Sequence, residues 1–351
     1  MEKKKYSELY GSIKKKILSG EYKPSDKLPS KRVVSDLYGC SVITAEKAYA
    51  MLADEGYIVA KQRSGYFVNS LDLPYTGTPT DVHDEIHYIP EEITAVSDTF
   101  EYSLWFKTIR RVISDYGERL FVKSPGMGCA VLRNALADYL LRYRGMTANP
   151  ERIVIGSGAE QLYETVVKLL GRDKVYGIED PSYSQIEAVY KGYGVKLEKL
   201  KLSHDGIDSF TLKNKSVDVL HVTPFRSYPT GITVPVSKRY EYLKTAGNGK
   251  YIVEDDFNSE FFTPGHPVES LYSLDKKGVV IYINTFSKSI SPSVRMGYMI
   301  LPENLMEVYR ERLGNFSCSV PVLDQYVLAE FISSGNFERH LNRMRRKMRN
   351  D

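Results

Sequence analysis

The amino-acid sequence predicts two domains: a small α+β domain of helices with a β-hairpin, and a larger α/β domain with a mainly parallel sheet. In residues 1–70, three segments repeat apolar residues at helical spacing, and two short apolar runs follow them. In residues 98–351, apolar runs of strand length alternate with helical patterns, which is typical of α/β folds. Residues 71–97 carry proline, glycine and threonine without periodicity, so we expect a linker there.

The first two predicted helices each have one apolar face. The first ends at Gly20, and its inward side chains are expected to be Tyr6, Leu9, Tyr10, Ile13 and Ile17. The second begins at Ser30, whose side chain can cap the first turn, and ends at Gly39. Its expected inward side chains are Val33, Val34 and Leu37.

The third predicted helix begins at Ser41, a second capping serine, and ends at Gly56. Its expected inward side chains are Ala45, Ala48, Tyr49 and Leu52. Its outward face is expected to begin with Val42, Ile43, Thr44 and Lys47. Residues 57–60 and 66–68 then predict a hairpin around a turn that contains Lys61 and Arg63.

Three helices followed by a hairpin form a winged helix-turn-helix. In such a domain the third helix enters the major groove of DNA, and the hairpin contacts the backbone or the minor groove. Residues 1–70 contain 13 Lys and Arg against 8 Asp and Glu, whereas most of the remaining chain is acidic. This uneven charge favours contact with nucleic acid through the N-terminal domain.

Three strings in this domain resemble the GntR family of bacterial regulators. They are Lys-Leu-Pro-Ser-Lys-Arg at 27–32, Ser-Val-Ile-Thr at 41–44 and Gly-Tyr-Phe-Val at 65–68. The resemblance implies that the residues in contact with DNA are Ser30, Lys31, Arg32, Ser41, Thr44, Lys47, Arg63 and Gly65. Many family members carry arginine after the serine that starts the third helix, and Val42 occupies that position here.

The larger domain places polar residues after its strand-like runs. The predicted strands are 152–155, 174–178, 218–223, 251–254, 279–284 and 297–301, and the predicted helices include 104–114, 130–144, 162–170 and 337–349. Because ligands of open α/β sheets bind at the carboxyl ends of the strands, we expect these polar residues to form one site.

Lys288 ends the polar loop that follows the run 279–284. Asp255 follows another run, 33 residues upstream, and Arg295 lies seven residues downstream. This is the spacing of a pyridoxal phosphate site, where a lysine forms a Schiff base with the aldehyde, an aspartate pairs with the pyridinium nitrogen and a cation meets the phosphate. The adjacent Asp256 remains an alternative for the aspartate.

Three further motifs, residues 228–231, 254–261 and 285–298, resemble the fold-type-I pyridoxal phosphate enzymes of the aspartate aminotransferase superfamily. The whole chain resembles more closely the MocR type of regulator, where a GntR-like domain precedes an aminotransferase-like one. The resemblance implies pyridoxal 5′-phosphate as the cofactor and Lys288 as its covalent partner. It also implies that the cofactor is contacted by Asp255, Tyr183, Ser157, Gly158, Ala159, Ser287, Arg295 and Tyr228.

Two departures from the resembled family bear on activity. Phe257 occupies a position where the family usually has tyrosine, whose hydroxyl binds the phenolic oxygen of the cofactor. The family also continues into a small C-terminal domain that carries the arginine for a substrate carboxylate, and we expect this chain to lack that domain. Because such an arginine is a main source of substrate orientation, we expect poor transaminase activity.

These observations predict a cytoplasmic transcription regulator that binds pyridoxal phosphate, a double-stranded DNA operator and an amine or amino-acid effector, and that forms a homodimer. The cysteines Cys40, Cys129 and Cys318 form no paired motif, which favours reduced thiols in the cytosol. The sequence contains no apolar run of membrane-spanning length and predicts no metal site. Two alternatives remain: an active aminotransferase that carries a DNA-binding domain, and a truncated regulator without cofactor.

Overall fold

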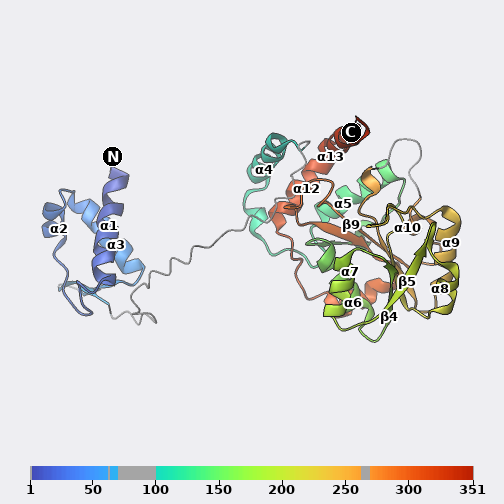
Figure 1. Ribbon diagram of the computed structural model, residues 1–351. Coiled ribbons are helices and arrows are strands. Elements are labelled where there is room, and N and C mark those ends of the chain that lie inside the picture. Colours follow the sequence, from blue (N-terminus) through green and yellow to red (C-terminus); the bar gives the residue numbers. More distant parts are fainter. Residues whose placement is uncertain (1, 62–63, 70–99, 262–268, 351) are drawn as a thin grey trace. The chain divides into compact units, whose positions relative to one another are not determined.

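The computed structural model describes residues 2–61, 64–69, 100–261 and 269–350 (Figure 1). The chain forms two compact units, and the division between them lies within residues 70–99. The predicted linker, residues 71–97, therefore lies outside the described residues, as does Arg63 of the hairpin turn.

The described residues of the N-terminal unit form three helices and a two-stranded antiparallel sheet, as predicted. Its elements are α1 (Glu2–Leu18), α2 (Lys31–Leu37), α3 (Val42–Asp54), β1 (Ile58–Lys61) and β2 (Gly65–Val68). Ser30 and Ser41 cap α2 and α3 because their side chains accept hydrogen bonds from backbone N–H groups of the first turn. The core of this unit consists of Leu9, Ile13, Ile17, Leu28, Val34, Ala45, Ala48, Tyr49, Leu52, Ile58 and Val68.

Two of the side chains expected to face inward from α2 face solvent instead. Val34 is 2% exposed, whereas Val33 and Leu37 are 49% and 70% exposed. Val33 and Leu37 are four residues apart and share one face of the helix, and Val34 lies about 100° around the axis from Val33. A helix of seven residues presents only a narrow strip to its neighbours, and that strip passes through Val34. The prediction that Val33 and Leu37 are inward is therefore wrong.

The C-terminal unit is built on an eight-stranded sheet of order β3-β10-β9-β8-β7-β4-β5-β6. The strands are β3 (Ile153–Gly156), β4 (Val175–Asp180), β5 (Lys196–Ser203), β6 (Gly206–Ile207), β7 (Val219–Val222), β8 (Tyr251–Asp255), β9 (Val280–Thr285) and β10 (Gly297–Ile300). The strands from β9 to β5 are mutually parallel, whereas β10 is antiparallel to both of its neighbours and β6 is antiparallel to β5. The predicted α/β class with a mainly parallel sheet is confirmed.

Helices cover both faces of this sheet (Figure 1). One face carries α5 (Ala130–Tyr139), α12 (Val322–Ser333) and α13 (Asn336–Asn350), and the other carries α6 (Ala159–Leu170), α7 (Ser184–Gly192) and α11 (Met306–Leu313). Within β9, Tyr282 joins the first of these cores while Ile281 and Ile283 join the second, because alternate side chains of a strand point to opposite faces. The other α-helices are α4 (Tyr102–Tyr116), α8 (Ser209–Asn214), α9 (Val236–Thr245) and α10 (Leu271–Leu274).

The six predicted strands of this unit are found, each with ends within two residues of the prediction. The sequence did not predict β5 and β6. In β5, leucines are interrupted by Lys196, Lys199 and Lys201, which suits a strand close to the edge of a sheet but weakens its apolar pattern. The C-terminal helix is confirmed as α13, and α6 begins three residues earlier than predicted.

Within the described part of the chain, no helix combines the length and the apolar character needed to cross a bilayer. The same residues contain no group of three or more His, Cys, Asp or Glu side chains that could hold a metal ion.

Candidate cofactor site

A cavity of about 570 Å³ opens where the parallel strands β8 and β9 end. Its lining residues are Ala159, Glu160, Tyr163, Tyr183, Tyr228, Asp255, Phe257, Thr285, Ser287, Lys288 and Arg295. Seven of the nine residues predicted to contact or react with the cofactor are among them. Ser157 and Gly158, the remaining two, do not line this cavity but precede Ala159, which does.

Lys288 reaches the cavity from the loop that follows β9. Its Nζ donates a hydrogen bond to Asn258 Oδ1 and lies 5.4 and 5.5 Å from the ring centroids of Phe257 and Phe261. Partial burial lowers the pKa of Lys288, and the positive charge of Arg226 lowers that pKa further. A lysine with a lowered pKa has a larger neutral fraction, and the neutral amine is the nucleophilic form.

Asp255, the last residue of β8, is 2% exposed, and buried polar side chains lie around its Oδ2 atom. Its Oδ2 accepts a hydrogen bond from the hydroxyl of Tyr163, and His221 Nε2 lies 3.7 Å from the same oxygen. The other ring nitrogen of His221, Nδ1, is 2.7 Å from the hydroxyl of Tyr190. Asp255 Oδ1 has no hydrogen-bond partner among the described residues. Because an unpaired buried acceptor is costly, this oxygen is suited to an N–H donor that enters the cavity.

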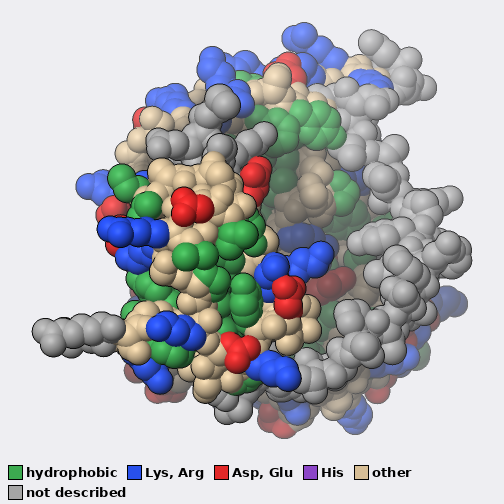
Figure 2. All heavy atoms as spheres, turned by 90° about the vertical axis from the view of Figure 1, so that its left-hand side faces the viewer, with side chains coloured by type: hydrophobic (Ala, Val, Ile, Leu, Met, Phe, Trp, Pro, Cys, Tyr) green, Lys and Arg blue, Asp and Glu red, His purple; other side chains and the backbone are tan. Residues whose placement is uncertain are grey.

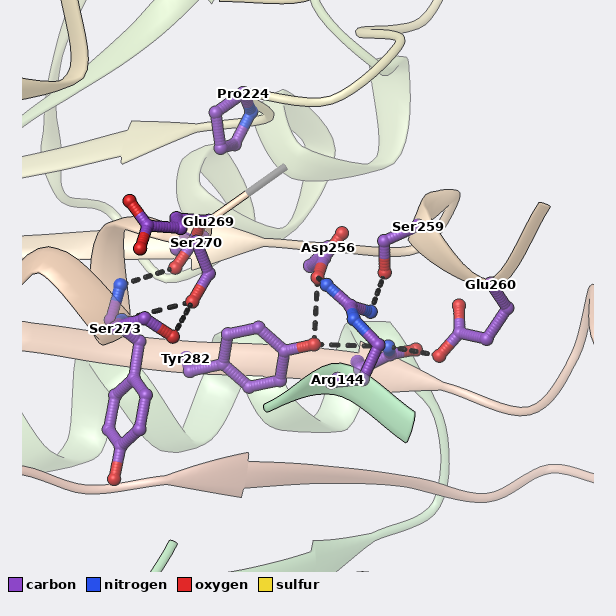
Figure 3. A network of polar contacts seen from close by, with 12 residues as sticks. Arg144, Pro224, Asp256, Ser259, Glu260, Glu269, Ser270, Ser273 and Tyr282 are labelled. Carbon is purple, nitrogen blue, oxygen red and sulfur yellow. Dashed lines mark hydrogen bonds and ion pairs between the residues drawn. The ribbon is translucent and has the colours of Figure 1, made fainter. Parts of the chain in front are cut away.

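The neighbouring carboxylate, Asp256, does not line the cavity. Its Oδ2 accepts hydrogen bonds from Arg144 Nη2 at 2.9 Å and from the hydroxyl of Tyr282 at 2.8 Å. Figure 3 shows Arg144 between Asp256 and Ser259, to which it also donates a hydrogen bond. The two adjacent aspartates therefore have different surroundings: Asp255 borders the cavity, and Asp256 belongs to a buried ion pair.

The ion pair of Asp256 extends into a buried polar network that reaches the C-terminal helix. Asn284 Nδ2 donates to Glu260 Oε1 at 2.7 Å, and Arg345 Nε of α13 donates to the carbonyl oxygen of Glu260 at 2.6 Å. Burial raises the pKa of Glu260 to about 7, against the opposing effect of Arg144. The network thereby ties α13 to the segment that supplies the Asn258 contact of Lys288.

Arg295 lines the cavity and also an adjoining hollow of about 340 Å³, which Ser157 lines as well. The guanidinium is 56% exposed and lies 3.4 Å from Glu160 Oε2. Gly158 precedes α6 with a φ of 100°, and a Cβ atom at that position would lie 3.4 Å from Arg295 Nη2. A glycine turn at a helix N-terminus beside an arginine provides both N–H donors and positive charge for an anion.

Besides Tyr163, the aromatic residues Tyr183, Tyr228 and Phe257 line the cavity and give it flat apolar surfaces. The rings of Tyr183 and Tyr228 are 6.1 Å apart and inclined by 79°, and both are partly exposed. Burial raises the pKa of Tyr183, so its hydroxyl stays neutral at neutral pH. Phe257 lines the same cavity. The position where the sequence departs from the resembled family therefore lies within the site.

In the N-terminal unit, Thr44 does not face outward as predicted. It is 7% exposed, and its hydroxyl is 2.8 Å from the hydroxyl of Ser41. Both side chains therefore serve the N-terminal cap of α3, with Ser41 also accepting from the backbone N–H of Thr44. The prediction of an outward Thr44 is wrong because the residue at the third helical position completes the cap.

The other residues predicted to contact DNA differ in their exposure to solvent and in their contacts within the unit. Lys31 forms an ion pair with Glu46 of α3 at 2.5 Å, whereas Arg32 and Lys47 are exposed. Gly65 begins β2 with a φ of 112°, a conformation that favours glycine at the hairpin tip. Figure 2 shows a face of the molecule on which exposed hydrophobic side chains lie beside Lys and Arg side chains.

Sequence analysis missed several residues of the site. Tyr163, which donates a hydrogen bond to Asp255, lies on α6, and His221, whose Nε2 is 3.7 Å from the same carboxylate, lies in β7. Both segments have the apolar patterns of an ordinary helix and strand. Asn258 lies within a motif that was recognised, but nothing in the motif indicated contact with Lys288. The available signal for His221 was a histidine in an otherwise apolar strand that ends beside the predicted site.

Two family models match the chain. The model described as bacterial regulatory proteins of the gntR family matches residues 5–68, and the model of aminotransferase class I and II matches residues 106–351. The chain is 33% identical to the uncharacterized HTH-type transcriptional regulator YdeL of Bacillus subtilis (strain 168), covering 98% of this chain and 76% of YdeL. It is 29% identical to the probable rhizopine catabolism regulatory protein MocR of Rhizobium meliloti, covering 97% of this chain and 74% of MocR.

Solved aminotransferases share the fold of the C-terminal unit. An archaeal alanine:glyoxylate aminotransferase matches with a TM-score of 0.63 and 23% identity, over 70% of this chain and 63% of its own. The α-aminoadipate aminotransferase LysN of Thermus thermophilus, complexed with N-(5′-phosphopyridoxyl)-L-leucine, matches with a TM-score of 0.63 and 26% identity, over 72% of this chain and 65% of its own. The chain thus spans less than two thirds of the length of these enzymes.

Proposed function

Because the chain belongs to the GntR family of bacterial regulators and carries an aminotransferase class I and II domain, we propose that it is a pyridoxal phosphate-responsive transcription regulator. Its N-terminal unit binds duplex DNA, and its C-terminal unit binds pyridoxal 5′-phosphate and an amine or amino-acid effector. The cofactor or its effector shifts the population of a state with different DNA affinity. A homodimer would present two N-terminal units to two half-sites.

The observation that carries this proposal is one cavity lined by a nucleophilic lysine, an arginine and a buried carboxylate oxygen that has no hydrogen-bond partner among the described residues. Lys288 supplies the amine with a lowered pKa, Asp255 supplies the buried Oδ1 atom, and Arg295 lies beside the glycine turn of α6. These groups fit a flat ring that carries an aldehyde, a nitrogen and a phosphate. LysN, a structural relative, holds a phosphopyridoxyl ligand.

In this assignment each residue has one task. Lys288 would hold the cofactor covalently, Asp255 would keep a proton on the ring nitrogen through Oδ1, and Arg295 with Ser287 and the turn 157–159 would bind the phosphate. Tyr183 would cover the ring. Pyridoxal phosphate, when bound, supplies an aldehyde that reacts with amines and a ring that withdraws electrons. Phe257 cannot donate a hydrogen bond, so the oxygen beside the aldehyde loses the donor that tyrosine would give.

A direct test is whether pyridoxal phosphate changes DNA affinity. Duplexes are enriched from a randomised library by the full chain, and affinity for the enriched duplex is measured with and without added pyridoxal phosphate and with a panel of amino acids. Coupling between two sites is typically about 1–3 kcal/mol, so we expect a change of about 5- to 150-fold. Unchanged affinity, while absorbance demonstrates bound cofactor, would contradict the sensing function.

The two adjacent aspartates offer a matched pair of variants. We expect Asp255→Asn to weaken pyridoxal phosphate binding about 10-fold or more, because a hydrogen bond to a charged group contributes about 1.5–3 kcal/mol. Asp256→Asn should leave that affinity nearly unchanged and should lower the free energy of unfolding, because Arg144 loses its charged partner. Absorbance titration with the cofactor and denaturant unfolding measure the two effects. The opposite pattern would assign the ring nitrogen to Asp256.

For DNA binding we expect a steep dependence on salt, because each phosphate contact releases counterions. Replacing the exposed Lys47 with alanine should reduce the slope of log K against log salt concentration by about 1. Lys213, an exposed lysine on α8, serves as the control, and Lys213→Ala should leave the slope unchanged. Equal slopes for all three proteins would exclude Lys47 as a phosphate contact.

An active aminotransferase is the second candidate, and the cavity with Lys288 and Asp255 favours it. Incubation with amino acids and a keto-acid acceptor separates the two. Steady turnover that disappears in Lys288→Ala would make catalysis part of the function, whereas ligand-dependent DNA binding without keto-acid release would support the regulator.

A further inference from the structure

The start of α3 exposes two branched apolar side chains. Val42 and Ile43, at the first two positions of the helix, are 44% and 67% exposed. The opposite face of the same helix is fully buried through Ala45, Ala48, Tyr49 and Leu52. The first turn of α3 therefore exposes two apolar side chains that are not part of the core of this unit.

Polar side chains at this end of α3 have partners inside the unit. The hydroxyls of Ser41 and Thr44 contact each other in the cap, and Glu46 is paired with Lys31 at 2.5 Å. Lys47 is exposed one turn into the helix. The first turn of α3 thus has an apolar tip, and the exposed cation of Lys47 lies one turn further along the helix.

We propose that Val42 and Ile43 recognise the C5-methyl groups of thymine in the major groove. This inference rests on the proposed binding of duplex DNA by the N-terminal unit, and it names the base that α3 selects. DNA is the partner that the surroundings favour, because residues 1–70 have an excess of basic residues and the exposed Lys47 lies next to the apolar pair.

The chemistry of the groove supports thymine in particular. Each base pair presents hydrogen-bonding groups there, but among the four bases only thymine presents a methyl group. Branched side chains such as Val42 and Ile43 offer no hydrogen bond to a base edge, so they distinguish bases through apolar contact and shape. An arginine after the capping serine could instead hydrogen-bond guanine. Val42 in place of arginine therefore changes the base that is read as well as removing a contact.

The test uses duplexes that the full chain enriches from a randomised library. Each thymine of an enriched duplex is replaced in turn by deoxyuridine, which lacks only the methyl group. At one or two thymines of each half-site we expect affinity to fall about fourfold, which corresponds to about 0.8 kcal/mol for one buried carbon. At those positions, Ile43→Ala or Val42→Ala should bind the thymine and the deoxyuridine duplexes equally.

Leu18, at the end of α1 and 48% exposed, provides the matched control: Leu18→Ala should retain the full deoxyuridine effect. Tight binding without any deoxyuridine effect would overturn the thymine inference and leave the proposed DNA binding intact. Failure to enrich any duplex would overturn both. A shift from dimer to monomer in Ile43→Ala, with the deoxyuridine effect retained, would overturn the inference in favour of a contact between two copies of the chain.

Discussion

Replacing Lys288 with alanine is expected to abolish covalent capture of pyridoxal phosphate. Among the described residues that line the cavity, Lys288 is the only lysine. Burial and the positive charge of Arg226 lower the pKa of its amine. After incubation with the cofactor and reduction with borohydride, the native protein should gain the mass of one reduced cofactor on the peptide that contains Lys288. The Lys288→Ala protein should gain none, and its absorbance should be that of free cofactor.

A control variant and the pH dependence of the capture rate extend the same experiment. Lys47→Ala removes an exposed lysine of the other unit and should leave capture unchanged. Capture requires the neutral amine, so its initial rate should rise as pH increases through the lowered pKa of Lys288. Arg226→Ala removes the second cause of that lowering and should move the rise to higher pH. Reduction onto a different lysine in the native protein, or undiminished capture by Lys288→Ala, would refute the assignment.

The chemistry of the cavity could be predicted from the sequence because parallel strands place their carboxyl ends at one edge of the sheet. Asp255 ends β8 and Lys288 follows the neighbouring strand β9, so two polar residues that are 33 positions apart in sequence meet at one cavity. The same rule does not reach Tyr163, whose contact with Asp255 depends on how α6 is rotated against the sheet. The apolar pattern of α6 identifies its buried face, but it does not show which buried side chain of that face reaches the end of β8.

The sequence did not indicate which of two adjacent residues takes a given role in the structure. Asp255 and Asp256 have the same chemistry, and only their side-chain directions assign one to the cavity and the other to Arg144. In the N-terminal unit, likewise, helical spacing identified α3 and its buried face but placed Thr44 outside. A threonine hydroxyl at this position can hydrogen-bond either to water or within the helix cap. In the structure the hydroxyl of Thr44 contacts that of Ser41 in the cap.

The largest loss of stability is expected from Arg144→Met. Arg144 and Asp256 are 6% and 4% exposed, and their nitrogen and oxygen atoms are 2.9 Å apart. Removing one partner of a buried pair leaves the other charge without compensation, which typically costs about 3–5 kcal/mol. The protein has one tryptophan, Trp105, which packs against Phe331 in the C-terminal unit. Its fluorescence during denaturant unfolding therefore reports the free energy of unfolding of that unit alone.

Two further variants determine whether the loss arises from the unpaired charge. Arg111 is 64% exposed and pairs with Glu330 at the surface, so Arg111→Met should cost no more than about 1 kcal/mol. The double variant Arg144→Met with Asp256→Leu removes both buried charges, and such replacements are often neutral or stabilising. It should therefore regain most of the stability lost in Arg144→Met, giving a strong coupling energy between the two positions. If the two substitutions instead destabilise additively, the cost comes from lost packing and from the broken contacts of Tyr282 and Ser259, and not from an uncompensated aspartate.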